Sequence, residues 1–388
     1  MRRNRVTSLA VIVAATSLAV GSAVSAQSPA AVSMAPAGSS DLKIGLVTDV
    51  GQLNDKNFNQ YSWQGAVEGA ARIGAAEPQS AVSAVSSDIA KNIQAFVDQD
   101  YDIIVTVGFA AGADTAKAAK ANPETLFIGV DQNFVCLDAN GDIDTTPEGA
   151  PDCEGAGDSA TTLPNRVGIG WHEEQPGYLA GIVAAHLSKT GVIAAIGGTA
   201  SVPAVPNYII GFQNGAKSVN PDIDVRTVYV SPAPDAKAFF DPAEGNLQAT
   251  QLLSLYPDID VMFQVAGATG NGVLQAACDA GIYGIGVDVD QFVSTPEYAK
   301  CIVVSAEKKL QKNVSDMVVK AAAGELPAGG IKLDITTDDV GLSSFHDFQS
   351  LVTPELQAAL DTATAGLKDG SIQACELTPF QSCVVPAQ

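Results

Sequence analysis

The segment TDVGQLNDKNFNQ, near the amino end of the chain, gathers side chains suited to holding a small polar molecule. Asp49 and Asn59 offer hydrogen-bond acceptors and donors, and Gly51 permits a sharp turn between them. Phe58 supplies a ring that can stack on a flat ligand, because aromatic rings prefer offset parallel or edge contacts. The same ring could instead staple the start of the helix that follows.

Three further small or polar residues stand where β-type runs end. Asp288 and Asp131 directly follow the runs IYGIGV and LFIGV, and Gly267 stands one residue beyond the run DVMFQV. Ligands of parallel α/β sheets bind beyond the carboxyl ends of the strands, so we expect these residues to face a ligand. Asp288 could instead cap a helix, and Asp131 could cap its own loop.

Other chemistry is poorly supported by the motifs. GATGNG, followed by Asp288, approaches a dinucleotide fingerprint without the G-x-G-x-x-G spacing. DANGDID spaces its acids as a calcium loop does, but its glycine is not the sixth residue and no acid stands at the twelfth position. No GxSxG motif, no convincing Ser/His or Cys/His pair and no CxxC occurs. The motifs therefore give no support for catalysis, and no catalytic residue, metal or cofactor is expected.

Behind these motifs, β-type runs alternate with Ala-rich stretches of helical spacing, as in parallel βαβ units. A first series of strands is expected at 43–48, 102–107, 126–130 and 167–170, and a second at 191–198, 224–230, 260–265, 282–287 and 301–305. Helices are expected at 58–73, 174–188, 208–218 and 271–280. The sequence thus predicts an α/β fold with two doubly wound parallel sheets in tandem.

The amino end reads as a secretory signal peptide, with three arginines, an apolar stretch and a small-x-small cleavage site after Ala26. The first cysteine is Cys136, so no lipid anchor is expected, and the protein should be exported. We expect these divisions: signal peptide 1–26, flexible leader 27–40, first lobe 41–170 with an insertion at 133–164, second lobe 171–305, and a crossover and C-terminal segment 306–388 that completes the lobes.

The formal net charge is −22. A charge of this sign repels nucleic acid and anionic lipid, so neither is an expected partner. Six cysteines in an exported chain predict disulfides. Short loop closure favours the pairs Cys136–Cys153, Cys278–Cys301 and Cys375–Cys383 among several connectivities. The second pair should also stiffen the segment that presents Asp288.

The opening segment resembles the D-x-G-x-x-x-D-K-x-F-N pattern of the basic membrane protein family of ABC-transporter solute-binding proteins, whose better-known branch binds purine nucleosides. Further matches follow in family order from about Asp41 to about Glu325: GFAAGADTAKAAKANPETLFIGVD, WHEEQPGYLAGIVAAHLSKTGVIAAIGG, GFQNGAKSVNP, FQVAGATGNGVLQAA and IGVDVDQ. The resemblance implies a type I periplasmic-binding-protein fold, in which two lobes joined by hinge crossovers close on the ligand.

The resemblance also implies a division of labour among residues. In nucleoside-binding members, two aromatic rings enclose the base, and Phe58 matches the first. Tyr208 stands at the place of the second, where a Phe is usual. Asp49 and Asn59 match positions at the base edge, and Gly267 matches a backbone contact near the sugar.

A carboxylate and a lysine hold the ribose in those members, and Asp288 and Lys308 match them, with Lys309 as the alternative lysine. The implied function is delivery of a nucleoside, specifically a purine nucleoside, by a monomeric binding protein to a membrane ABC permease. Other readings remain open: a binding protein for a sugar or another polar metabolite, a sensory receptor, and a secreted enzyme that uses a dinucleotide.

Overall fold

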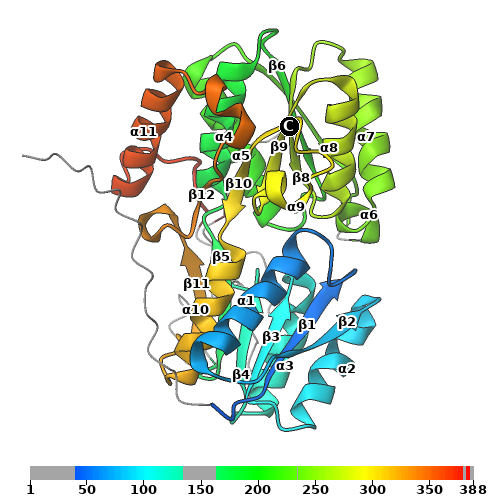
Figure 1. Ribbon diagram of the computed structural model, residues 1–388, viewed down its shortest axis with the longest axis vertical. Coiled ribbons are helices and arrows are strands. Elements are labelled where there is room, and N and C mark those ends of the chain that lie inside the picture. The colour runs from blue at the N-terminus through cyan, green and yellow to red at the C-terminus, as the bar shows by residue number, and fades with distance from the viewer. Residues whose placement is uncertain (1–39, 134–162, 234, 379–381, 385–388) are drawn as a thin grey trace, which may run out of the picture. The chain divides into compact units, whose positions relative to one another are not determined.

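A computed structural model describes residues 40–133, 163–233, 235–378 and 382–384 (Figure 1). The expected signal peptide, almost all of the leader and of the insertion, and the cysteines Cys136 and Cys153 lie outside the described residues. Among the described helices, none has both the length and the apolar character that crossing a membrane requires.

The described chain forms two lobes, each built on a six-stranded sheet (Figure 1). The sheet of lobe 1 is parallel throughout, in the order β11-β5-β4-β3-β1-β2. Its strands are β1 (Ile44–Val50), β2 (Gln79–Ser83), β3 (Ile103–Val107), β4 (Leu126–Val130), β5 (Arg166–Trp171) and β11 (Gly329–Leu333).

The sheet of lobe 2 has the order β12-β10-β9-β8-β6-β7, and only β12 runs antiparallel to its neighbour. Its strands are β6 (Val192–Gly197), β7 (Asp224–Tyr229), β8 (Val261–Val265), β9 (Tyr283–Asp288), β10 (Ile302–Lys308) and β12 (Val340–Leu342). The predicted α/β class with two parallel-dominated, doubly wound sheets is therefore confirmed.

Helices cover both faces of each sheet (Figure 1). Lobe 1 carries α1 (Phe58–Ile73), α2 (Ser86–Val97), α3 (Gly112–Ala121) and α10 (Leu310–Ala322). Lobe 2 carries α4 (Glu174–Leu187), α5 (Ala204–Val219), α6 (Ala236–Phe239), α7 (Pro242–Leu255), α8 (Thr269–Ala280), α9 (Gln291–Ser294) and α11 (Pro354–Asp369).

The described chain crosses between the lobes three times: from β5 to α4, from β10 to α10, and from β11 to β12. The second crossing explains why α10, which is late in the sequence, packs on α1 in lobe 1. It also places Lys308, the last residue of β10, at the boundary of the two lobes.

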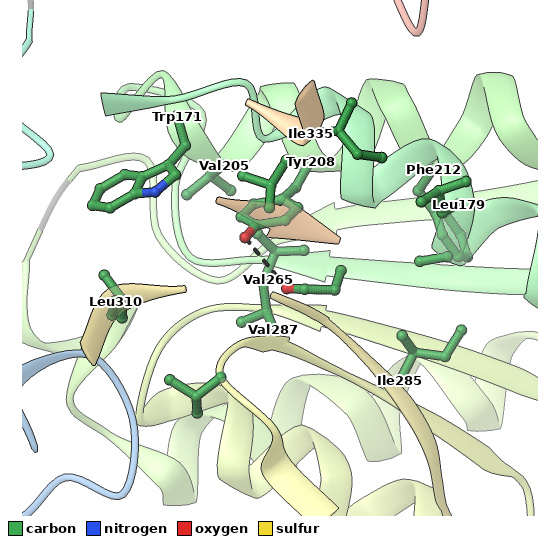
Figure 2. Packing of buried hydrophobic residues seen from close by; sticks show 14 of the residues in the cluster. Trp171, Leu179, Val205, Tyr208, Phe212, Val265, Ile285, Val287, Leu310 and Ile335 are labelled. Carbon is green, nitrogen blue, oxygen red and sulfur yellow. Dashed lines mark hydrogen bonds between the residues drawn. The ribbon is translucent and has the colours of Figure 1, made fainter. Parts of the chain in front are cut away.

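The core of lobe 2 extends to this boundary (Figure 2). The rings of Tyr208 and Phe212 flank Phe263 at centroid distances of 6.1 and 5.0 Å, and all three side chains are buried. Close packing of α4 on α5 depends on Gly177 and Gly211, because a Cβ at either would clash with backbone of the facing helix. This packing holds the start of α4 against the turn of α5 that carries Tyr208.

Three strands have no counterpart among the expected elements: β2, β11 and β12. β2 has the sequence QSAVS and is mostly exposed, and each of the three lies at an edge of its sheet. Edge strands bury fewer side chains, so they lack the continuous apolar run that marks a central parallel strand. Helix α5 begins at Ala204 rather than 208, because Pro206 is tolerated in a first helical turn.

The cystines Cys278–Cys301 and Cys375–Cys383 both form, with Cα–Cα distances of 5.3 and 5.7 Å. Cys301 precedes β10, and its carbonyl accepts a hydrogen bond from Gly284 at the start of β9. Asp288 ends β9, so it lies at the opposite edge of the sheet from this bridge. The bridge ties the carboxyl end of α8 to the residue before β10, so the expectation that it lies beside Asp288 and stiffens that segment is corrected.

Candidate ligand-binding site

A cavity of about 140 Å³ opens between the lobes, at the carboxyl ends of both sheets. The structure brings seven of the eight expected site residues into its lining. Lobe 1 and lobe 2 both contribute to this set: Asp49, Phe58, Asp131, Tyr208, Gly267, Asp288 and Lys308. A ligand in this cavity would touch both lobes, which is the geometry that hinge closure requires.

Asn59, the eighth residue, does not line the cavity. Its side chain is buried, and its Oδ1 accepts a hydrogen bond of 3.1 Å from the backbone N–H of Asp49. Its Nδ2 donates to the carbonyl of Gln52 at 3.3 Å. Asn59 lies on the inner side of α1, and its hydrogen bonds stabilise the loop before that helix. The resemblance implied a contact with the base edge, whereas the structure gives Asn59 this supporting role instead.

Lys308 is the charged centre of the site and is only 2 % exposed. Its Nζ lies 2.8 Å from both carboxylate oxygens of Asp131, 3.7 Å from Glu173 and 3.9 Å from Asp288. Burial alone would lower the pKa of Lys308, but the three carboxylates raise it well above its ordinary value, so the ammonium stays charged. Lys309 pairs with Glu307 instead and does not line the cavity.

Three aromatic rings surround the same ammonium. Lys308 Nζ lies 5.5 Å from the ring centroid of Phe58, 5.0 Å from that of Trp171 and 5.9 Å from that of Tyr208. These are cation–π distances, and the interaction is stronger where the cation is shielded from water. The rings and the carboxylates together fix one position for the lysine side chain.

Tyr208 has partners for its hydroxyl. The OH group lies 3.3 Å from the carbonyl oxygen of Ala306 and 3.5 Å from Asp288 Oδ1. Burial first, and then the charge of Asp288, raise the pKa of Tyr208 well above its ordinary value, so the hydroxyl remains a donor. The tyrosine thus links the aromatic part of the site to its carboxylate part.

Asp131 and Asp288 share an uncommon backbone conformation. Their φ angles are +59° and +66°, in the left-handed region, which aspartate adopts more readily than most residues. Each stands at the carboxyl end of a strand, where residues held in such conformations often serve a ligand site. The N-cap of α9 is Asp290, so Asp288 is not the cap of that helix.

The cavity is acidic. Five aspartates and one lysine line it within the described part of the chain: Asp49, Asp55, Asp131, Asp235, Asp288 and Lys308. Burial raises the pKa of Asp49 to about 7. The hydrogen bond from the Val50 N–H lowers this pKa, whereas the charges of Asp131 and Asp55 raise it further. Burial likewise raises the pKa of Asp288 to about 6, although Lys308 opposes it. Such a lining favours ligands rich in hydrogen-bond donors and repels anions.

Several lining residues were not foreseen from the sequence. Asp55 lines the cavity and also accepts hydrogen bonds from the backbone of Asn59 and Gln60 at the start of α1. It occupies the second aspartate of the D-x-G-x-x-x-D-K pattern, a signal that could have found it. Phe240, from the loop before α7, lines the cavity and packs on Gly51 of lobe 1. No local sequence pattern indicates this role, because it depends on a contact between the two lobes.

Two such sheets, with three crossings between the lobes and a cavity at their carboxyl edges, form the fold of the periplasmic solute-binding proteins. A solute-binding protein of an ABC transporter from Aeropyrum pernix has this fold, with a TM-score of 0.69, 19% identity, and coverage of 86% of this chain and 92% of that one. Residues 43–365 match the family model of the PnrA-like ABC transporter substrate-binding proteins, called Bmp. The chain belongs to this family, as its sequence motifs predicted.

Curated relatives agree with this placement. The ABC transporter nucleoside-binding protein BmpA of Lactococcus lactis is 28% identical over 353 residues, 86% of this chain and 88% of the relative. The CD4+ T-cell-stimulating antigen of Listeria monocytogenes is 27% identical over 361 residues, with 87% and 89% covered. Basic membrane protein A of Borreliella burgdorferi is 29% identical over 265 residues, which cover 67% of each chain.

Proposed function

We propose that this protein binds a purine nucleoside in the interlobe cavity, outside the cytoplasm, and delivers it unchanged to the permease of an ABC transporter. The observation that carries the proposal is the arrangement around Lys308. A fixed ammonium and the Asp288 carboxylate stand beside the Tyr208 ring, with the Phe58 ring facing the same cavity from the other lobe.

This arrangement suits the two halves of a nucleoside. Vicinal ribose hydroxyls both donate and accept hydrogen bonds, so a carboxylate and an ammonium 3.9 Å apart can hold them together. The base is flat and apolar on its faces, and it can lie against Phe58 and Tyr208. The name of the Lactococcus lactis relative, a nucleoside-binding protein, supports the same assignment.

The charge of the cavity favours a nucleoside over a nucleotide. A nucleoside is uncharged, whereas a nucleotide carries a phosphate that five aspartates would repel. Asp49 and Asp55 stand near the loop before α1 and can accept hydrogen bonds from N–H groups on a base edge.

A simple sugar is the second candidate, because structurally similar proteins bind sugars. One is AraP, an arabinose-binding protein from Geobacillus stearothermophilus, with a TM-score of 0.54 and 12% identity. Aromatic rings and carboxylates serve sugar sites as well.

Titration calorimetry of the purified full chain separates these candidates. The panel is guanosine, adenosine, guanine, guanosine monophosphate, ribose and arabinose. We expect guanosine or adenosine to bind at micromolar concentration or tighter, and the free base and the monophosphate to bind at least tenfold more weakly. Heat from ribose or arabinose with none from either nucleoside would refute the proposal. Mass spectrometry of the recovered ligand should show it unchanged.

A further inference from the structure

The C-terminal cystine lies on the helix that presents Tyr208 to the cavity. Cys375 and Cys383 are joined, and residues 377 and 383 form a β-bridge. Both cysteines are buried against Ile210 of α5. We call the described residues 374–378 and 382–384 the cystine segment. It follows the part of the chain that matches the family model, which ends at residue 365.

Two asparagines on one face of α5 hold the segment. The backbone N–H of Cys383 donates to Asn207 Oδ1 at 2.8 Å, and Asn214 Nδ2 donates to the carbonyl of Ala374 at 2.8 Å. Residues seven apart lie on the same side of a helix, and Ile210 lies between them. The segment is thus fastened along two turns of α5 by two hydrogen bonds and an apolar contact.

Asn207 also contacts the neighbour of the site lysine, Glu173, although neither side chain lines the cavity. It is only 1 % exposed, and its Nδ2 donates to Glu173 Oε2 at 2.9 Å. The other oxygen of Glu173 lies 3.7 Å from Lys308 Nζ. Glu173 immediately precedes α4, at the crossing from lobe 1 to lobe 2. A single buried amide therefore joins the cystine segment to the carboxylate that faces the site lysine.

The charge of Glu173 depends on these neighbours. Burial alone would raise its pKa, but Lys308, Lys332 and the hydrogen bond from Asn207 outweigh burial and lower it. A buried carboxylate without its hydrogen-bond donor would shift toward water or toward other donors. Lys308 is held by three carboxylates, so movement of one of them changes where the ammonium rests.

We propose that Asn207 is a positioning residue, and that the Cys375–Cys383 cystine acts through it and Glu173 to set the position of Lys308 in the ligand cavity. Closure of the cystine fixes the backbone N–H of Cys383, that N–H orients the Asn207 amide, and the amide presents Nδ2 to Glu173. The effect on ligand affinity rests on the proposed nucleoside function, whereas the effect on Lys308 does not.

The test compares two cystines of the full chain. The double variant Cys375→Ala, Cys383→Ala removes the cystine that is proposed to orient Asn207. The double variant Cys278→Ala, Cys301→Ala removes a cystine at the sheet edge away from the cavity. We expect the first pair to raise the dissociation constant of guanosine about tenfold, equivalent to about 1.4 kcal/mol. The second pair should change it less than twofold while still lowering the melting temperature. Equal effects of the two pairs on affinity would overturn the proposal.

A swap of hydrogen-bonding groups distinguishes positioning from general damage. Asn207→Asp should weaken guanosine binding, because two carboxylates then face each other. Combining it with Glu173→Gln restores one donor and one acceptor and leaves the total charge unchanged, so part of the lost affinity should return. If the double variant binds guanosine no better than Asn207→Asp does, the hydrogen bond between residues 207 and 173 does not position Lys308, and the proposal fails.

Tryptophan fluorescence gives a readout that needs no ligand. The chain has two tryptophans, and Trp171 lies 5.0 Å from Lys308 Nζ. In a Trp63→Phe background, opening Cys375–Cys383 should shift the emission of Trp171, and opening Cys278–Cys301 should not. If no nucleoside binds the native protein, the proposed function fails, and this comparison still decides the positioning claim: unchanged emission in both variants would refute it.

Discussion

Lys308 and Asp131 form a buried ion pair between the lobes: the ammonium lies 2.8 Å from both carboxylate oxygens, although 177 residues separate the two in sequence. Asp131 follows β4 of lobe 1, and Lys308 ends β10 of lobe 2. Both residues line the cavity, so the pair links the two lobes beside it. In the proposed binding mode a ligand would compete for the same ammonium, so we expect ligand binding to change the contact between the lobes.

Asp131→Asn should therefore destabilise the protein. Loss of one partner of a buried pair usually costs several kcal/mol, but Glu173 and Asp288 remain within 4 Å of the ammonium, so we expect about 1–3 kcal/mol. Urea unfolding measures this change. Lys91→Gln is the control, since that lysine is 74 % exposed in its pair with Asp88 and does not line the cavity, and it should cost less than about 0.5 kcal/mol. Equal losses in the two variants would contradict a special role for the interlobe pair.

Gly51→Ala should impair closure of the lobes. Gly51 has a φ of +126°, and a Cβ there would come within 2.9 Å of Phe240 Cε1 on the opposite lobe. Only glycine combines this backbone conformation with so close a contact. We expect guanosine affinity to fall at least tenfold and the radius of gyration of the ligand-saturated protein to increase.

Gly281→Ala provides the control for that variant. Gly281 has a φ of +70° at the end of α8, but no atom lies within 4 Å of its added Cβ. It should lose about 1 kcal/mol of stability and bind guanosine normally. A Gly51→Ala protein that also binds and compacts normally would show that Phe240 does not close the cavity.

Asp49→Asn should stabilise the protein above neutral pH. The unfolded carboxyl titrates near 4 and the folded one at about 7, so between these values the folded state binds more protons. The free energy of unfolding consequently falls as pH rises from about 4 to about 7, and the cost is complete above that range. Because the side chain is only partly buried beside the cavity, we expect a gain on the order of 2 kcal/mol at pH 8.

The same substitution should have little effect at pH 4, where the carboxyl is protonated in the folded state. Urea unfolding at pH 4, 6 and 8 follows this trend. A constant difference across the three pH values would show that the substitution acts through packing or hydrogen bonding, and not through the buried charge.

Removal of the Cys278–Cys301 cystine should reduce stability without affecting the site. The cystine closes a loop of 23 residues, and the chain-entropy model gives about 3 kcal/mol for a loop of this size. Calorimetry of the double alanine variant should show a lower melting temperature. A change in guanosine affinity beyond twofold would restore the sequence-based expectation that this bridge stiffens the Asp288 segment.

Sequence patterns located the parts of the site that depend on local order. Asp131 and Asp288 were found because each ends a buried strand, and parallel strands bring their carboxyl ends to one edge. Lys308 required the family resemblance, because a single lysine has no distinguishing local pattern. Phe58 was a candidate from its place at the start of a helix, and the resemblance favoured a ligand contact over a helix staple. Asn59 carries the right chemical groups but lies on the inner side of α1, which depends on how the helix packs.

Glu173 was not expected near the site lysine. It stands in the motif WHEEQPGYLAG, which the sequence alone describes as the start of a helix. Its proximity to Lys308 arises from the crossing between lobes and from the close packing of α4 on α5. The edge strands β2, β11 and β12 were missed for a related reason, because their pairing is decided by neighbours distant in sequence.

A crystal structure of the full chain grown with guanosine would show whether the interlobe cavity holds a nucleoside. We expect the base between Phe58 and Tyr208, the ribose hydroxyls within hydrogen-bond distance of Asp288 and Lys308, and the Lys308–Asp131 distance longer than 2.8 Å. Guanosine bound outside the interlobe cavity, or inside it with the ribose away from Asp288 and Lys308, would refute the proposed binding mode.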